Sequence, residues 1–228
     1  MPAATLPDTP LTPEAHLTPE AHLTPEAFAA LTGADDRALA DLEVYRTRLV
    51  DWNQRMNLVG PATLPAFWSR HALDSAQLLP LAPGALTWAD LGTGAGLPGI
   101  VLAILSRDRP GFHVHLVESV AKRCRFLEAV TEELGLPATV HNARAEALDL
   151  SVDIVTSRAC APLVRLLGYA RPYFRRGAGA LFLKGQDVVA EIEVATRSWD
   201  FEVDILPSLS DGRGRILCIR SSGRGPRR

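Results

Sequence analysis

The sequence has few of the residues that mark secreted, metal-stabilised or membrane-spanning proteins. Its 228 residues include three cysteines, Cys124, Cys160 and Cys218, which lie far apart and form no CxxC pair. This spacing supports neither a disulfide framework nor a zinc site. No apolar run approaches the roughly 20 residues that cross a bilayer, and the N-terminal residues lack the basic start and apolar stretch of an export signal. We therefore expect a cytoplasmic globular protein without a membrane span or metal ion.

Lysine is nearly absent, and the net charge is close to zero. Of the 24 basic residues only Lys122 and Lys184 are lysines, and the formal net charge is −2. A chain this close to neutrality does not coat nucleic acid by charge alone, so any nucleic-acid contact must be local. A genome that favours arginine codons explains the shortage, and two remaining lysines can fall anywhere by chance. Both nevertheless lie inside motifs.

Residues 11–28 read LTPEAHLTPEAHLTPEAF, three near-copies of a six-residue unit. Each Thr-Pro-Glu can begin a helix, because threonine caps, proline fits the first turn and glutamate suits the positive end of the helix dipole. Only the third copy leads into a predicted helix. Tandem identity favours duplicated sequence over a metal site at His16 and His22. We assign residues 1–34 to a partly disordered N-terminal segment.

A helical region precedes a region in which strand and helix signals alternate. Apolar residues recur at helical spacing from Asp35 to Asn57, and a second helical stretch, AFWSRHALDSAQLL, follows Pro65. We expect these helices to form a cap at residues 35–82. From Pro83 onward strands and helices take turns, which predicts an α/β fold with a mostly parallel sheet covered on both faces.

Seven strands are expected in this Rossmann-like domain, which we assign to residues 83–220. They read TWADLG, HVHLVES, ATVHNA, VDIVTSRA, GALFLKG, FEVDILP and RILCIR. The loop SLSDGRG between the last two is too short for a crossover helix, so these strands should pair antiparallel at the sheet edge. A basic tail, residues 221–228, follows the sheet.

The stretch ADLGTGAGLPGI, residues 89–100, joins the first expected strand to the helix after it, where open α/β sheets bind ligands. No lysine lies near Gly92, which excludes the triphosphate loop GxxxxGK[ST], and the dinucleotide pattern GxGxxG requires glycine where Leu97 stands. The spacing of Gly92, Gly94 and Gly96 lets the backbone approach a ligand closely, while Leu97 supplies an apolar surface. This combination favours a flat, uncharged ligand over a pyrophosphate.

The second expected strand ends at Glu118, where an acid can accept hydrogen bonds from both hydroxyls of a ribose. Together with the glycine loop, this acid predicts S-adenosylmethionine as the ligand. In the alternative interpretation Glu118 is a charge at a helix N-terminus, and the glycines only turn the chain.

Five motifs, WNQRMNL, RHALDS, DLGTGAGLPGI, SRACAPL and LKGQ, occur in the order of a known family. From about Trp52 to the last strand the chain resembles the bacterial small-subunit ribosomal RNA (guanine-N7) methyltransferases, also called glucose-inhibited division protein B. The resemblance implies a class I methyltransferase that uses S-adenosylmethionine to methylate N7 of one guanine in 16S rRNA, free or within the 30S subunit or an assembly intermediate. The family commonly has aspartate at the position of Glu118.

The resemblance also implies contacts with the methyl donor. In the family the donor lies against the positions matched by Gly92 and Leu97. It also touches the pair matched by Ala145 and Glu146, after the third strand, and the arginine matched by Arg158, in the fourth-strand motif.

Methylation at guanine N7 agrees with what the sequence lacks. N7 carries an in-plane lone pair and no proton at neutral pH, so alignment and desolvation should carry the rate without a general base. We find no Ser-His-Asp, paired-carboxylate or metal-cluster spacing. SRACAP also differs from the Asn/Asp-Pro-Pro-aromatic turn of amine methyltransferases. A 5-methylcytosine enzyme needs a cysteine nucleophile, for which Cys160 is the alternative candidate, although a small buried thiol is the commoner role.

Three residues are candidates for positioning the substrate. Lys184 follows the fifth strand and could contact phosphate or guanine O6, Arg144 follows the third strand, and His71 comes from the cap, with a core histidine as its alternative. His113 and His115 share a strand face but make an incomplete metal site.

Further arginines offer phosphate contacts or, in the alternative, a solvated surface. They are Arg158, Arg165, Arg171, Arg175 and Arg176, with six more from Gly212 onward. Two rival functions stay open, a small-molecule methyltransferase and a non-catalytic ribosome assembly factor that binds the same ligand.

Overall fold

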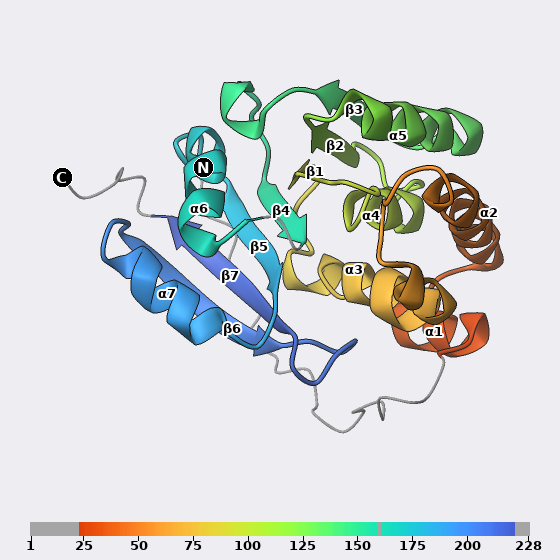
Figure 1. Cartoon of the computed structure of the whole chain (residues 1–228), viewed down its shortest axis with the longest axis horizontal. Coiled ribbons are helices and arrows are strands. Elements are labelled where there is room, and N and C mark those ends of the chain that lie inside the picture. The colour runs from red at the N-terminus through yellow and green to blue at the C-terminus, as the bar shows by residue number, and fades with distance from the viewer. Residues whose placement is uncertain (1–22, 159–160, 222–228) are drawn as a thin grey trace.

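The computed structural model describes residues 23–158 and 161–221, which form a seven-stranded sheet with helices on both faces (Figure 1). The strand order is β3-β2-β1-β4-β5-β7-β6. The strands are β1 (Thr87–Leu91), β2 (His113–Glu118), β3 (Ala138–Asn142), β4 (Ile154–Arg158), β5 (Gly179–Lys184), β6 (Phe201–Pro207) and β7 (Arg215–Ser221). The first five pair in parallel, which confirms the predicted Rossmann-like fold.

The last two strands pair antiparallel, as predicted, but β6 forms the sheet edge and β7 lies one place inside it. β7 runs antiparallel to both β5 and β6. Its side chains Ile216, Leu217, Cys218 and Ile219 are all buried, whereas β6 alternates between half-buried and exposed residues. The buried apolar run therefore belongs to the strand covered on both sides, and the alternating run belongs to the edge.

Helices form two layers around the sheet. They are α1 (Pro25–Thr32), α2 (Asp36–Asn53), α3 (Asp74–Ala76), α4 (Gly99–Leu105), α5 (Ala121–Leu134), α6 (Leu163–Phe174) and α7 (Val188–Thr196). One hydrophobic core joins α4, α5 and the cap helices to the sheet, and a second core lies under α6 and α7. Within the described residues no helix is both long and apolar enough to span a membrane.

The predicted helix after the third repeat is confirmed as α1. The Thr24 side chain accepts a hydrogen bond from the Ala27 backbone N–H at 3.2 Å, which satisfies one of the unpaired donors of the first turn. Leu23 and Phe28 are buried in the larger core. The first two copies, with His16 and His22, lie outside the described residues.

The predicted second cap stretch is helical, but it is not a regular α-helix: η2 (Trp68–Leu73) runs directly into α3, and the turns η1 (Pro61–Ala66) and η3 (Leu79–Leu81) flank them. Pro61 and Pro65 both lie in η1, a 3₁₀ turn. It does not extend into a longer helix because proline lacks the backbone N–H that such a helix needs. η2 is π-helical, and the Asp74 N–H reaches back to Ser69 O. Periodicity alone could not distinguish this wide turn from an α-helix.

The cap packs on the glycine loop through Tyr45 of α2. This side chain is fully buried, and its hydroxyl donates to Ala95 O at 2.8 Å. Its ring lies 5.8 Å from that of Phe67 and 6.5 Å from that of Phe126, centroid to centroid. The cap and the sheet thus share one core, and the division of the chain at residues 34, 82 and 220 stays a prediction.

Tyr45→Phe should lower the free energy of unfolding by about 1–3 kcal/mol, because it leaves the buried carbonyl of Ala95 without this donor. Urea denaturation measures the change. Tyr169→Phe, on half-buried Tyr169 of α6, is the control and should change stability less. Equal stability of Tyr45→Phe and the wild type would show that the hydroxyl does not hold the cap on the loop.

Candidate functional site

A cavity of about 730 Å³ opens between the carboxyl ends of the central strands, the cap and the loop that joins β6 to β7. Six of the residues singled out from the sequence line it: His71, Gly92, Gly94, Leu97, Arg158 and Lys184. Gly96, Glu118, Ala145, Glu146 and Arg144 are not among its lining residues. The structure thus gathers part of the predicted set in one place.

The glycine loop owes its shape to backbone conformations that favour glycine. Gly92 and Gly94 have φ angles of +64° and +58°, in the left-handed region. The Gly94 N–H donates to Glu118 Oε2 at 3.1 Å, and the Val120 N–H donates to Glu118 Oε1 at 2.8 Å. Glu118 is 4% exposed, so it supports the loop and the start of α5 from behind the cavity wall.

Gly96 serves internal packing. A Cβ at this position would lie 2.3 Å from Ile100 Cδ1 and 3.1 Å from Leu127 Cδ2. Both distances are shorter than normal van der Waals contact, so only glycine lets the loop pass over the start of α4. Its part in ligand binding stays a prediction.

Asp90, which the sequence analysis missed, does not line the cavity but supports the glycine loop from behind. It is fully buried at the end of β1, and its Oδ2 accepts hydrogen bonds from Thr93 Oγ1 and, at 2.9 Å, from the Gly99 N–H. Oδ1 has no partner among the described residues. Burial raises the pKa of this carboxyl to about 6. A lone acid within the apolar strand TWADL was the available signal, since buried acids need partners.

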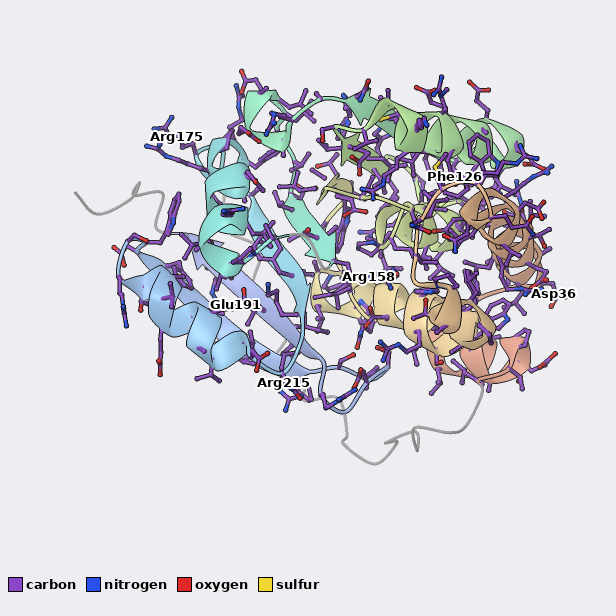
Figure 2. All side chains as sticks on the ribbon, viewed as in Figure 1. Asp36, Phe126, Arg158, Arg175, Glu191 and Arg215 are labelled. Carbon is purple, nitrogen blue, oxygen red and sulfur yellow. The ribbon has the colours of Figure 1, made fainter. Side chains whose placement is uncertain are left out.

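Arg158 connects the end of β4 to the cap (Figure 2). Its Nη1 donates to Arg70 O at 2.9 Å and to His71 Nδ1 at 3.0 Å, and it lies 3.5 Å from Asp74 Oδ2. All three partners belong to the motif RHALDS. The two motifs, widely separated in the sequence, therefore meet at one guanidinium group.

These contacts determine the protonation state of His71. A guanidinium only donates, so Nδ1 accepts, and Nε2–H must donate to Thr63 Oγ1 at 2.9 Å. The Thr63 hydroxyl donates in turn to Gly60 O at 2.7 Å. Burial, with the charges of Arg158 and Arg70, lowers the pKa of His71 to about 3. The imidazole is thus a neutral connector between Arg158 and the 3₁₀ turn η1.

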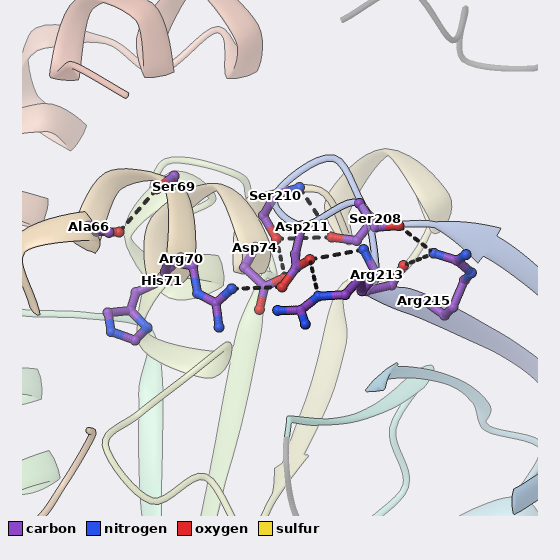
Figure 3. A network of polar contacts seen from close by, with 12 residues as sticks. Ala66, Ser69, Arg70, His71, Asp74, Ser208, Ser210, Asp211, Arg213 and Arg215 are labelled. Atoms are coloured by element: carbon purple, nitrogen blue, oxygen red, sulfur yellow. Dashed lines mark hydrogen bonds and ion pairs between the residues drawn. The ribbon is translucent and has the colours of Figure 1, made fainter. Parts of the chain in front are cut away.

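The same cap motif holds the β6–β7 loop over the cavity (Figure 3). Asp74 Oδ1 accepts from Ser210 Oγ at 2.6 Å, and Arg70 Nη1 lies 2.7 Å from Asp211 Oδ2. Two further loop residues, Arg213 and Arg215, line the cavity, and the Arg213 side chain is 76% exposed. In the sequence these two arginines stood out only as members of the arginine-rich stretch from Gly212 onward, whereas the fold brings them beside the cap.

The motif WNQRMNL forms another wall. Asn53, at the end of α2, accepts hydrogen bonds through Oδ1 from the backbone N–H groups of Leu58 and Val59, at 2.8 and 3.0 Å. Both residues line the cavity, together with Gly60. A single side-chain amide thus shapes the loop that follows the helix.

The other candidate residues occupy different positions. Lys184 lines the cavity, but its Nζ lies 2.7 Å from Glu191 Oε2 and donates to Ala161 O at 3.2 Å. Arg144 is exposed, 3.8 Å from Glu146 Oε1. Ala145 lies in η4 (Ala145–Ala147), just beyond β3, where its carbonyl accepts from the Tyr173 hydroxyl.

Histidines gather on the outer strands, away from the cavity lining. His115 Nδ1 lies 3.0 Å from His141 Nε2, and His113 Nε2 lies 2.9 Å from Thr139 Oγ1. Across the part of the chain that the structure describes, no group of three or more His, Cys, Asp or Glu residues could hold a metal ion. Cys160 and the arginines beyond residue 221 lie outside that part.

The chain matches the family model for rRNA small subunit methyltransferase G over residues 38–216. The ribosomal RNA small subunit methyltransferase G of Caulobacter vibrioides is 59% identical over 197 residues, covering 86% of this chain and 91% of that protein. The protein of the same name from Methylorubrum populi is 47% identical over 186 residues, covering 80% and 88%.

Solved structures share the fold at low identity. A putative O-methyltransferase from Klebsiella pneumoniae has a TM-score of 0.56 and 15% identity, covering 86% of this chain and 95% of that one. A mutant of MtNAS in complex with S-adenosylmethionine has a TM-score of 0.53 and 16% identity, covering 91% and 86%. At these identities the likeness shows a common fold only.

His71→Gln should change how stability depends on pH. The pKa of His71 is lower in the folded state than its ordinary value of 6.5, so the unfolded chain binds more protons and stability falls as pH drops below about 6.5. This contribution is about 1.4 kcal/mol per pH unit. Asp90, whose raised pKa acts in the opposite direction, is present in both proteins.

Urea denaturation at about pH 7.5, 6.5 and 5.5 measures the effect. Between the two lower values the wild type should lose about 1 kcal/mol more than the variant, because an unfolded-state histidine is already half protonated at pH 6.5. Parallel pH profiles would contradict a neutral, buried His71.

Proposed function

Because the chain belongs to the rRNA small subunit methyltransferase G family, we propose that it transfers the methyl group of S-adenosylmethionine to N7 of one guanine in 16S rRNA. The observation that carries the proposal is the cavity in which five family motifs converge, with the glycine loop on one side and arginines on the other. Such an enzyme would act in the cytoplasm, on the 30S subunit or an assembly intermediate.

The site fits S-adenosylmethionine in three respects. Its volume, about 730 Å³, suits a ligand of this size. Gly94 borders it with open space, since the nearest atom to an added Cβ would be Gly92 O at 3.8 Å. Asp90 Oδ1 is a buried acceptor still without a partner among the described residues, directly behind the loop. We therefore assign Gly92, Gly94, Leu97 and Arg158 to this ligand.

Three more residues complete the assignment at the ends of the neighbouring strands. Glu118 ends β2, and Ala145 and Glu146 follow β3. Parallel strands place these ends along one edge of the sheet, beside the glycine loop. We assign them to the adenosine half of the ligand.

When bound, S-adenosylmethionine supplies a methyl group activated by the positive sulfonium. The chain's own residues then need only align guanine and exclude water, since N7 has no proton to remove. The site agrees with this requirement, because both ring nitrogens of His71 are engaged and its low pKa keeps it neutral. Asp90 is held behind the loop by Thr93 and Gly99.

The RNA side of the site carries cations. Arg70, Arg123, Lys184, Arg213 and Arg215 line the same cavity. Exposed Arg213 stands on the β6–β7 loop, where a guanidinium can bind phosphate through two N–H groups. Phosphate contacts of this kind set affinity and orientation, whereas guanine recognition requires contacts to the base.

Purified enzyme and labelled S-adenosylmethionine should methylate 30S subunits that lack the modification at one guanine. Strand cleavage at 7-methylguanine maps the product, and protein-free 16S rRNA is compared as substrate. We expect 30S subunits or assembly intermediates to be the better substrate. No transfer to either RNA form, despite binding of S-adenosylmethionine, would contradict the proposal and favour a small-molecule methyltransferase or an assembly factor.

Gly94→Ala should weaken S-adenosylmethionine binding at least about tenfold, because the added methyl group projects from a strained backbone beside the ligand. Gly177→Ala is the matched control, since Gly177 also has a positive φ, +93°, and free space around it, but does not line the cavity. Calorimetry measures both affinities. Equal losses in the two variants would indicate a general effect of strain and remove Gly94 from the site.

A further inference from the structure

Lys184, Glu191 and the turn that precedes α6 form a polar cluster at one side of the cavity. The Lys184 side chain, at the end of β5, is 9% exposed, and Glu191 comes from α7, where Figure 2 labels it beside α6. Glu191 Oε2 lies 2.7 Å from Lys184 Nζ and accepts from the Leu163 N–H, also at 2.7 Å. One carboxylate oxygen thus serves two elements.

Glu191 supplies the cap that α6 lacks in its own sequence. The residue before the helix is Pro162, whose side chain cannot accept a hydrogen bond from the first turn. A helix N-terminus leaves backbone N–H groups unpaired and carries partial positive charge, so a carboxylate is favourable there. The carboxylate that stabilises α6 therefore comes from the neighbouring helix.

The turn itself is strained. Ala161 has a φ of +52°, the only positive value at a residue other than glycine among those the structure describes. A left-handed conformation costs an alanine roughly 1–2 kcal/mol, so the surroundings must hold it. Lys184 Nζ donates to Ala161 O at 3.2 Å, and Glu191 holds Leu163. The ion pair thus fixes both ends of the turn.

These contacts leave Lys184 with one donor to offer. An ammonium group has three N–H bonds, and two are directed to Glu191 and Ala161. No other hydrogen bond or ion pair of Lys184 Nζ exists among the residues that the structure describes, so the third N–H can serve a ligand in the cavity that Lys184 lines. Guanine presents O6 beside N7 on one edge, and a donor to O6 would leave the N7 lone pair free for methyl transfer.

We propose that Glu191 is a positioning residue, which acts through Lys184 to hold the guanine edge in line for methyl transfer. The proposal rests on the proposed function and adds to it the group that orients the lysine. Glu191 also balances the lysine charge, so that Lys184 acts as a directed donor rather than a general phosphate contact. Loss of Glu191 should therefore impair alignment more than RNA binding.

Steady-state kinetics with 30S substrate test whether loss of Glu191 impairs the alignment of guanine more than the binding of RNA. In Glu191→Ala, kcat should fall about tenfold, while KM for 30S stays equal or decreases, because the freed ammonium still attracts RNA. The affinity for S-adenosylmethionine should stay within about twofold. Glu191→Gln, which keeps an acceptor oxygen, should recover most of kcat. Glu193→Ala, at an exposed position of the same helix, is the control and should match the wild type.

A double variant separates positioning from folding. In Glu191→Ala/Ala161→Gly, glycine tolerates the left-handed conformation without the contacts of Glu191 to Lys184 and Leu163. The free energy of unfolding should therefore recover while kcat stays low. Full recovery of kcat would overturn the proposal, since Glu191 would then only hold the turn. An unchanged kcat in Glu191→Ala would overturn it too, whereas a wild type that methylates no rRNA would contradict the proposed function itself.

Discussion

The guanidinium of Arg158 is the contact on which the site depends, because it is where the cap meets the sheet. One nitrogen, Nη1, is within 3.5 Å of Arg70 O, His71 Nδ1 and Asp74 Oδ2. Those residues in turn hold the β6–β7 loop, through Asp211 and Ser210. Cap, central strand and C-terminal loop thus form one structure around the cavity, and the residue at its centre is the one expected to face the methyl donor.

Two acids, Asp90 and Glu118, hold the glycine loop, which lines the cavity. Asp90 holds Thr93 and Gly99, and Glu118 holds Gly94, so two carboxylates fix a loop whose glycines would otherwise leave it flexible. Glu191 does the same for the turn before α6. In each case a buried or half-buried acid accepts a hydrogen bond from a backbone N–H group. The unfavourable backbone conformations lie at the cavity, and the carboxylates that stabilise them lie just behind it.

The sequence predicted the fold well, because the period of apolar residues directly reflects local structure. The order of strands and helices followed from it, while the short loop SLSDGRG indicated the antiparallel end and the glycine spacing indicated the ligand loop. It could not predict the π-helical turn at Trp68–Leu73, or the position of β7 inside the sheet edge. Both depend on tertiary packing rather than on local pattern.

The site was predicted in part. Gly92, Gly94 and Leu97 could be identified from their place in the loop after the first strand. His71, Arg158 and Lys184 could be identified from the motifs that contain them. Their partners were hidden, because Arg158 and His71 are 87 residues apart and Asp74 and Ser210 are 136 apart. No spacing rule connects such pairs. Glu191 could not be found for the same reason, since on α7 it looks like any other acid of a solvated helix.

The proposed function requires that the site align guanine N7 and use no general base. The most direct test is the pH dependence of the single-turnover rate of methyl transfer to 30S subunits, from about pH 7 to 8.5. With His71 neutral and N7 free of a proton throughout, the rate should change by less than about twofold. A tenfold rise per pH unit would show that a group must lose a proton first, and would contradict the proposed function.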